Sequence, residues 1–225
     1  MIEFQNVSYT YNKGSGVTNL NFSIEDGDFV FLIGSTGSGK TTLMRLIYFD
    51  LWCDTGKIQV GDHNSELIRK KHVPHIRRNI GMVFQDYHLL NDRNVFHNVA
   101  LPLHVMGYNA NEIPYRVEEA LELVGFEGKR GHYPDELSGG EKQRVTLARA
   151  IVKEPDIILA DEPTGNLDPV AAFELVQLLE TINNNGTTIL MASHNYNLIK
   201  GRGRRILELK AVSYTHLKLP TRDLV

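Results

Sequence analysis

A glycine-rich loop near the start of the chain carries the residues best suited to chemistry. Residues 34–41 read Gly-Ser-Thr-Gly-Ser-Gly-Lys-Thr, between five apolar residues at 29–33 and a helical pattern that starts at Lys40. Glycines let a backbone wrap closely around phosphate oxygens, and a helix N-terminus attracts anions. The spacing therefore predicts a nucleoside-triphosphate site, with Lys40 at the β- and γ-phosphates and Thr41 at Mg²⁺. The predicted phosphate-binding residues are Gly34, Ser35, Thr36, Gly37, Ser38, Gly39, Lys40, Thr41 and Thr42.

Two acidic residues follow a second apolar run. Residues 156–160 predict a buried strand, and Asp161 and Glu162 stand directly after it. In one parallel sheet, this pair and the glycine-rich loop would face the same crevice. Asp161 is then the candidate second Mg²⁺ ligand, and Glu162 can orient or deprotonate an attacking water. His194 also follows a predicted strand and could contact the γ-phosphate, although such a histidine taken alone is more often a surface residue.

A third motif combines a hydroxyl with two glycines at a predicted helix start. Residues 137–144 read Leu-Ser-Gly-Gly-Glu-Lys-Gln-Arg, in which Ser138 and Glu141 have the spacing of a capping box. The same N-terminus, with Gly139 and Gly140, can bind an anion. These residues by themselves allow both interpretations, a capped helix start and a second anion-binding site.

Taken together and in order, these motifs resemble the ATP-binding-cassette (ABC) ATPase family over residues 1 to about 210. The resemblance implies Mg²⁺-dependent hydrolysis of ATP to ADP and phosphate, with ATP and Mg²⁺ as cofactors. It implies that Gln85 contacts Mg²⁺ and the attacking water, and that His194 is the switch histidine. The expected catalytic residues are therefore Glu162, His194 and Gln85, and the expected metal ligands are Thr41, Gln85 and Asp161.

The resemblance also implies a homodimer that closes head to tail around two ATP molecules. Ser138, Gly139 and Gly140 would then contact the γ-phosphate held by the other subunit, and Asp168 would lie in the loop that crosses the interface. An aromatic residue before the glycine-rich loop can stack on adenine or belong to the core, and both Tyr9 and Tyr11 qualify by local pattern. Tyr11 stands where the family has its stacking aromatic, which favours Tyr11.

Within the family, residues 75–102 are similar to ATPases of bacterial cell division that work with an integral membrane, permease-like subunit. Residues 161–168 also fit relatives that drive lipoprotein release or macrolide export, and these remain the alternative. The resemblance implies control of septal cell-wall hydrolysis from the cytoplasmic face of the plasma membrane, through the membrane partner. Residues 86–99 are expected to receive that partner, or to be ordinary core.

The elements that position these residues predict an α/β fold. The resemblance specifies a P-loop NTPase (RecA-like) ABC ATPase core with an antiparallel β element, made by a hairpin of residues 2–24, and an inserted α-helical subdomain. The expected domain spans 1–210, with core segments 1–86 and 154–210 and a helical subdomain at 87–153. Residues 66–78 predict a basic, solvated helix broken by Pro74, and Asn109 with Glu112 predicts a helix start by a capping box. Residues 211–225 are set aside as a non-native or disordered tail, because residues 212–217 resemble a translated sequencing adapter.

Composition excludes several other classes. The 225 residues carry 24 basic and 27 acidic side chains, a net charge of −3, which is not the footprint of a nucleic-acid-binding protein. A single cysteine, Cys53, excludes an internal disulfide. No apolar run is long enough to span a bilayer, so a membrane role requires a partner. A DNA-repair or ribosome-associated ABC protein would need a long coiled coil or a second cassette, and a non-hydrolysing scaffold would not need the complete catalytic set.

Overall fold

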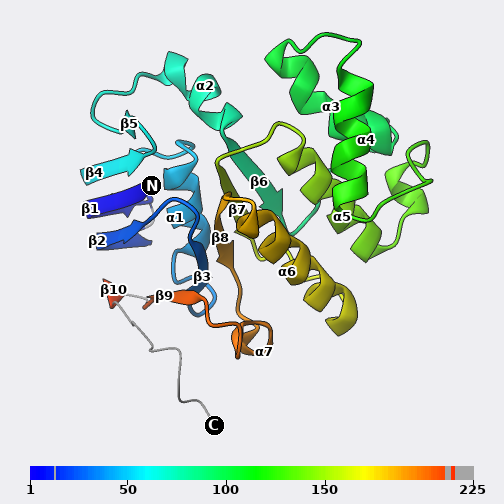
Figure 1. The fold of residues 1–225 in the computed structure, drawn as a ribbon. Coiled ribbons are helices and arrows are strands. Elements are labelled where there is room, and N and C mark those ends of the chain that lie inside the picture. The colour runs from blue at the N-terminus through cyan, green and yellow to red at the C-terminus, as the bar shows by residue number, and fades with distance from the viewer. Residues whose placement is uncertain (13, 211–213, 216–225) are drawn as a thin grey trace.

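The computed structural model describes residues 1–12, 14–210 and 214–215, which form two β-sheets and their covering helices (Figure 1). The larger sheet has the strand order β10-β9-β3-β8-β7-β6. All neighbours from β9 to β6 pair in parallel, and only β10 pairs antiparallel, against β9. The strands are β3 (Phe29–Ile33), β6 (Ile80–Phe84), β7 (Ile157–Asp161), β8 (Thr188–Ala192), β9 (Arg205–Leu209) and β10 (Tyr214–Thr215).

The parallel pairing brings the carboxyl ends of four strands to one edge. The glycine-rich loop follows β3, Gln85 follows β6, Glu162 follows β7 and His194 comes just after β8. In register, Leu32 of β3 lies beside Ala192 of β8, which itself lies beside Asp161 of β7. Segments far apart in the sequence therefore reach the same crevice, as the strand pattern predicts.

The second sheet is antiparallel, with the order β2-β1-β4-β5. Its strands are β1 (Ile2–Thr10), β2 (Gly16–Ile24), β4 (Thr55–Val60) and β5 (His63–Asn64). The predicted hairpin is confirmed, with Ile2 opposite Ile24 and Phe4 opposite Phe22. Its inward side chains share one core with helix α1 (Lys40–Ile47), which packs beneath the larger sheet.

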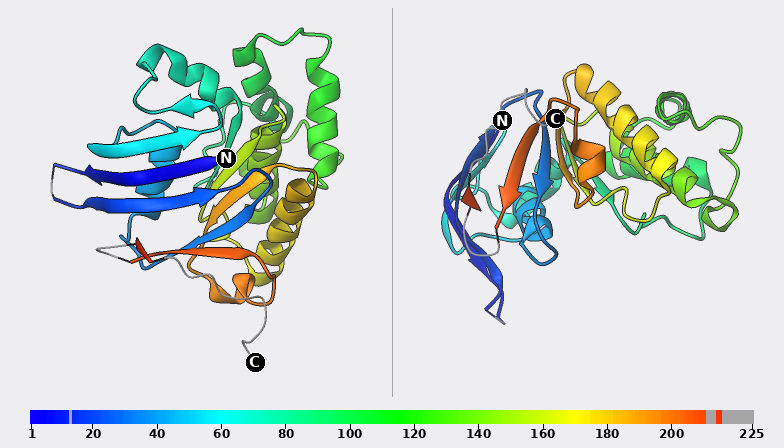
Figure 2. Two further views of the ribbon diagram at one scale, coloured as in Figure 1. Left: turned by 60° about the vertical axis from the view of Figure 1, so that its left-hand side comes forward. Right: turned by 90° about the horizontal axis from the view of Figure 1, so that it is seen from below.

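Alternate side chains of the buried strands face two separate cores. Val30 and Leu32 of β3 join the core that contains α1, whereas Phe29, Phe31 and Ile33 join the opposite core. That opposite core is built by α3 (Val95–Met106), α4 (Ile113–Leu123), α5 (Gly139–Ile151) and α6 (Pro169–Asn184). Figure 2 shows the small sheet and these helices on opposite sides of the central strands. Helices α1 and α5 are thus separated by the sheet.

Two predicted helix boundaries are wrong. Pro74 does not break a helix: it lies in the first turn of α2 (Val73–Arg78), after the short helix η1 (Lys70–His72), where a missing N–H costs nothing. α2 is also not fully solvated, because Val73 and Ile76 are buried. Asn109 does not cap a helix either; it accepts from the N–H of Asn111, and α4 starts later, with Pro114 in its first turn.

The capping box at Ser138 is confirmed. Ser138 Oγ accepts from the N–H of Glu141, and the Glu141 carboxylate accepts from the N–H of Ser138. Helix α5 follows the short helix η2 (Pro134–Glu136). The apolar side of α4 is buried through Ile113, Val117, Leu121 and Val124, and Gly125 follows the helix with a φ of 62°.

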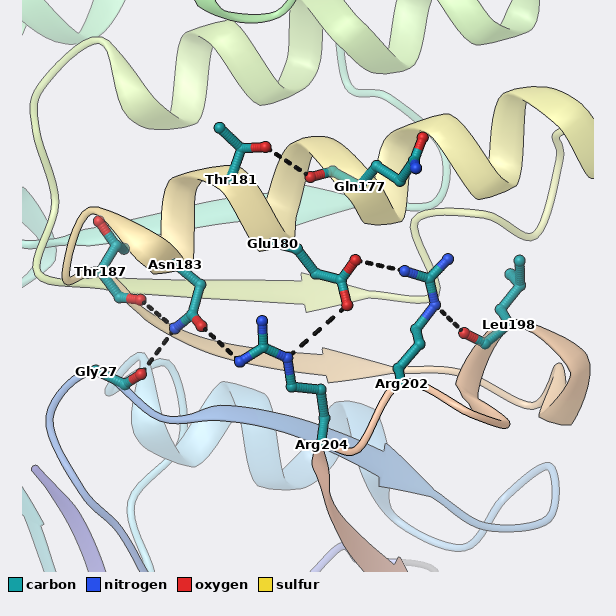
Figure 3. A network of polar contacts seen from close by, with 9 residues as sticks. All are labelled: Gly27, Gln177, Glu180, Thr181, Asn183, Thr187, Leu198, Arg202 and Arg204. Carbon is teal, nitrogen blue, oxygen red and sulfur yellow. Dashed lines mark hydrogen bonds and ion pairs between the residues drawn. The ribbon is translucent and has the colours of Figure 1, made fainter. Parts of the chain in front are cut away.

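A polar network fastens α6 to the chain that follows the short helix α7 (Tyr196–Ile199) (Figure 3). Arg202 forms an ion pair with Glu180 of α6 and donates from Nε to the carbonyl of Leu198 at 2.6 Å. Arg204 donates to Asn183 Oδ1 at 3.3 Å, and Asn183 donates to the carbonyl of Gly27 at 2.8 Å. The network therefore connects α6, α7 and the turn before β3.

Of the tail that was set aside, the structure describes only β10, which pairs with β9. The other residues of that prediction, 211–213 and 216–225, lie outside the described residues. Within the described part of the chain, no helix is both long and apolar enough to span a membrane.

Candidate nucleotide site

Helix α1 begins without a side-chain cap. Its N-cap residue is Gly39, with a φ of 102°, and among the described residues no side chain caps the helix start. The first turn contains no acidic residue. The leading N–H groups of a helix have no partner within the helix, and here their partial positive charge is available to an anion. This end of α1 has the properties of a phosphate site.

Two glycines of the loop are required by its shape. A Cβ on Gly39 would lie 2.5 Å from Val17 Cγ1, in a left-handed conformation that favours glycine. A Cβ on Gly34 would lie 2.5 Å from Ser38 Oγ and 2.6 Å from the carbonyl of Leu209. The loop can therefore wrap tightly only with glycine at both positions.

Lys40 lies at the centre of the site. Its side chain is 7% exposed, and Nζ donates to the carbonyl of Gly34 at 2.9 Å and lies 3.3 Å from Glu162 Oε1. The other oxygen of Glu162 bonds to Nδ1 of His194. Glu162 has a φ of 47°, a left-handed conformation that is rare for a residue with a side chain and that collects at functional sites. The structure thus joins Lys40, Glu162 and His194 in one chain of contacts.

A cavity of about 210 Å³ lies beside this chain of contacts. It is lined by Thr41, Phe84, Gln85, Asp86, His88, Asp161 and Glu162. Asp161 bonds to Thr41, and burial raises the pKa of Asp161 while the Thr41 hydroxyl opposes that shift. A nearby cation would remove this penalty, because it favours the ionised carboxylate.

The oxygen atoms that line the cavity fit Mg²⁺. They come from a hydroxyl, an amide and carboxylates, and Mg²⁺ prefers hard oxygen ligands. Among the described residues, no three His, Cys, Asp or Glu side chains form a metal cage. Mg²⁺ needs no such cage, since it usually binds through one or two carboxylates together with substrate phosphates. Thr41, Gln85 and Asp161, the predicted ligands, line this one cavity.

Gln85 is supported by the loop that follows β7. A Cβ on Gly165 would lie 2.9 Å from Gln85 Nε2, so glycine leaves room for that side chain. Asn166 Nδ2 donates to the backbone carbonyl of Gln85 at 3.2 Å. The loops after β6 and β7 therefore position Gln85 together.

Tyr11 lies beside the phosphate loop, and Tyr9 does not. The hydroxyl of Tyr11 is 3.4 Å from Thr42 Oγ1 and accepts from Arg45 at 3.5 Å. Tyr9 instead packs against the core beneath the small sheet, and its ring meets that of Tyr11 edge-on at 4.8 Å. The Tyr11 hydroxyl therefore contacts the end of the predicted phosphate-binding segment.

Residues 138–140 and Asp168 lie elsewhere. A Cβ on Gly139 would lie 3.1 Å from the Tyr87 hydroxyl, and one on Gly140 would lie 3.3 Å from Ala171 Cβ. Asp168 caps α6 by accepting from the N–H groups of Val170 and Ala171. Because α5 and α6 pack on the face of the sheet opposite α1, the structure does not bring these residues together with the phosphate loop of the same chain.

Sequence reasoning missed two polar residues of the cavity, Asp86 and His88. Their position directly after Gln85 is the available signal, although the sequence predicts partner binding for residues 86–99. Of the apolar residues in 86–99, Val95 is buried in the core and Leu89 packs against it, whereas Leu90 is 37% exposed. Leu90 is thus more accessible to a partner than Val95.

Comparison with known proteins assigns this site to a family. The ABC transporter family matches residues 17–165. The chain belongs to this family. Two curated relatives are cell division ATP-binding proteins FtsE, from Streptococcus pneumoniae (strain D39), 43% identical, and Escherichia coli (strain K12), 44% identical. The alignments cover 93% of this chain and 92% and 95% of the two relatives.

Solved structures agree with the family assignment. The chain matches the dimeric post-hydrolysis state of the ATP-binding cassette MJ0796 bound to ADP and Pi, with a TM-score of 0.88, 32% identity and full coverage of both chains. It also matches cbiO1 from Clostridium perfringens, part of the transporter complex cbiONQ, with a TM-score of 0.84 and 29% identity over 93% and 84% of the chains. The predicted P-loop ABC fold and the predicted family are confirmed.

Proposed function

We propose that the chain is the ATP-hydrolysing subunit of a cell-division membrane complex, acting with an FtsX-like permease partner. The observation that carries the catalytic part is the contact of Glu162 with both Lys40 and His194 beside an uncapped helix N-terminus. The assignment to cell division is supported by the FtsE relatives, which align with 93% of the chain. The alternative is the ATPase of a lipoprotein-releasing or macrolide-type exporter.

In the proposed reaction, the loop N–H groups and Lys40 bind the β- and γ-phosphates. Lys40 exchanges its contact with Glu162 for phosphate oxygens, which frees the carboxylate to accept a proton from water. That water attacks the γ-phosphorus, and the bond to the β-phosphate oxygen breaks to give ADP and phosphate. His194 holds the second oxygen of Glu162 and orients the carboxylate.

The remaining cavity residues would hold Mg²⁺. Thr41, Asp161 and Gln85 supply oxygen ligands, and Mg²⁺ when bound neutralises charge that develops on the phosphates. The residues from Gly34 to Thr42 are the proposed nucleotide-binding loop, with Tyr11 stacked on the adenine.

The arrangement of α5 supports a dimeric site. Ser138, Gly139 and Gly140 lie at a helix N-terminus on the other face of the sheet, so they can complete only a site that a second copy supplies. We assign Asp168 to the same interface. Two copies would then enclose two ATP molecules, each held by the phosphate loop of one chain and residues 138–140 of the other.

The complex would sit on the cytoplasmic face of the plasma membrane. Association would be peripheral, through the permease-like subunit, with residues 86–99 as the proposed contact and Leu90 its accessible apolar side chain. The proposed cassette spans residues 1–210, with the helical subdomain at 87–153. Its ATPase cycle would move the partner and so regulate septal cell-wall hydrolysis.

The decisive variant is Glu162→Gln, which keeps the shape of the side chain and removes its basicity. We expect retained ATP binding, accumulation of a closed dimer by size-exclusion chromatography with light scattering, and loss of phosphate release. Glu119→Gln on α4 is the matched control and should hydrolyse ATP normally. Undiminished turnover in Glu162→Gln would refute the role given to this carboxylate.

The partner is tested by affinity capture of the full chain from detergent-solubilised membranes, followed by identification of the co-purifying membrane protein. Recovery of an FtsX-like protein supports the cell-division assignment. Recovery of an exporter permease would replace it with the alternative and leave the ATPase assignment intact.

A further inference from the structure

Helix α5 directs a row of hydrogen-bond donors at the last residue of β6 and at the turn that follows it. Its members stand three residues apart, at Gln143, Thr146 and Arg149, so they lie on one side of the helix. Gln143 and Thr146 are fully buried. The contacts are Gln143 Nε2 to Phe84 O (3.3 Å), Thr146 Oγ1 to Tyr87 O (3.2 Å), Arg149 Nη2 to Tyr87 O (2.7 Å) and Arg149 Nη1 to His88 O (2.6 Å).

The backbone that Arg149 holds is in an unfavourable conformation. Tyr87 has a φ of 59° and His88 a φ of 49°, two consecutive left-handed residues with aromatic side chains. The N–H of His88 donates to the carbonyl of Asp86 and closes a tight turn around Tyr87. Such a conformation persists only where surrounding groups enforce it, and Arg149 binds both carbonyls of the strained pair.

This turn forms one wall of the catalytic cavity. The ring of His88 stacks on Phe84 at 4.6 Å and 14°, and both line the cavity together with Gln85. Gln85 therefore lies between β6 and a turn whose carbonyls accept hydrogen bonds from α5.

Arg149 is half-buried and pairs with backbone carbonyls. Within the described residues, no carboxylate forms an ion pair with it, and its guanidinium bonds to the two carbonyls. Desolvation lowers the pKa of Arg149, as expected for a cation without an acidic neighbour. The guanidinium of Arg149 is thus held by the carbonyls of Tyr87 and His88 rather than by a carboxylate.

We propose that Arg149 is a positioning residue for ATP hydrolysis, which holds the left-handed turn at Tyr87 and His88 and thereby places Gln85 in the catalytic cavity. The donor row and residues 138–140 belong to the same helix and its cap. A nucleotide bound by a second copy would contact the start of α5, and the same helix, through Arg149, would hold the turn that places Gln85. This role rests on the proposed function. Arg149 is not among the site residues that the sequence predicts.

The test compares steady-state ATP hydrolysis and the affinity for the fluorescent nucleotide mant-ADP, using the full chain. We expect Arg149→Met to lower kcat at least about tenfold while the mant-ADP Kd changes less than about threefold, because turnover and not nucleotide binding depends on the turn. Adding His88→Gly to Arg149→Met should recover at least about threefold in kcat, because glycine adopts positive φ without cost. If Arg149 had a merely structural role, the double variant Arg149→Met/His88→Gly would have a lower kcat than Arg149→Met alone.

Two further variants complete the experiment. Arg116→Met is the matched control: this arginine bonds to Glu154 at 2.9 Å and stacks over Tyr108 at 4.8 Å, and its kcat should stay within about twofold of wild type. If Arg149→Met fails to fold, Thr146→Val is the second variant. It removes the hydroxyl that is shared between the carbonyls of Tyr87 and Lys142 but keeps both Arg149 bonds, and it should lower kcat about threefold at unchanged mant-ADP affinity.

An Arg149→Met kcat within about twofold of wild type, or no recovery by His88→Gly, would overturn the proposal. An unchanged kcat in Thr146→Val would do the same if the Met variant does not fold. Loss of turnover in Glu162→Gln secures the proposed function separately, so failure of the Arg149 prediction then counts against Arg149 alone.

Discussion

The network of Figure 3 allows the cost of one buried ion pair to be worked out and measured. The perturbation is Arg202→Met, which keeps much of the side-chain length and removes the charge. The Arg202 and Glu180 side chains are 11% and 21% exposed, and Arg202 also lies over the ring of Phe173 at 4.8 Å. The substitution leaves Glu180 with Arg204 alone, at 3.8 Å.

Removing one partner of a buried pair typically costs about 3–5 kcal/mol, because the other charge stays buried without compensation. Here Glu180 keeps some solvent and a weaker contact with Arg204, so we expect about 2–3 kcal/mol. For a chain of this size that corresponds to a fall in Tm of roughly 4–12 °C. The double variant Glu180→Gln/Arg202→Met should recover part of the loss, because no unpaired carboxylate remains.

The assay is urea unfolding without nucleotide, followed by far-ultraviolet circular dichroism and by the fluorescence of Trp52. The matched control is Arg130→Met, which breaks the ion pair between Arg130 and Glu118. The two side chains are 63% and 41% exposed, respectively. Exposed pairs contribute only about 0–1 kcal/mol. The reasoning is refuted if Arg202→Met costs no more stability than Arg130→Met.

Three other predictions concern the nucleotide site and its surroundings. Tyr11→Ala should weaken ATP binding by about 1–3 kcal/mol, measured by fluorescence titration, whereas Tyr11→Trp should retain it; equal affinity of Tyr11→Ala and wild type would exclude stacking. Gly39→Ala should abolish nucleotide binding in the same titration, because the added Cβ meets Val17 at 2.5 Å; wild-type affinity would show that the loop tolerates this contact. The pKa of Glu141 is lowered to about 2 by Lys129 and by the N–H and hydroxyl of Ser138. The ionised Glu141 carboxylate should therefore stabilise the fold fully above pH 4.5, its ordinary pKa, and this stabilisation should be lost as the pH falls toward 2. Between pH 4.5 and pH 2, the urea midpoint should fall less in Glu141→Gln than in wild type. If the plots of midpoint against pH ran parallel for the two proteins, Glu141 would not be the source of the pH dependence.

The sequence determined those features that depend on residues close together in the chain. The phosphate loop is one, because consecutive N–H groups and the first turn of α1 form it without help from distant segments. The capping box of Ser138 and Glu141 is another, since both partners lie within one helical turn. The buried strands were equally legible, because residues 29–33 and 188–192 are nearly continuous apolar runs, the pattern of strands covered on both faces.

Local patterns failed where a neighbouring proline changed which backbone groups were available. A helix broken at Pro74 is the prediction from pattern, but a proline in a first turn removes no intrahelical bond, and α2 starts around it. Asn109 and Glu112 had capping-box spacing, yet Asn109 turns back on Asn111 and α4 begins after them. Both errors are shifts of helix boundaries, the least well specified feature of a pattern.

Only the tertiary structure decided which distant residues meet. It placed Glu162 between Lys40 and His194, brought the Tyr11 hydroxyl to Thr42, and set Arg149 against the carbonyls of Tyr87 and His88. It also put the start of α5 and the phosphate loop on opposite faces of one sheet. The physical reason is that strand order and helix placement follow from burying whole apolar faces, which no local motif encodes. The phosphate loop is therefore specified by its own residues, whereas its catalytic neighbours are specified by the packing of the entire chain.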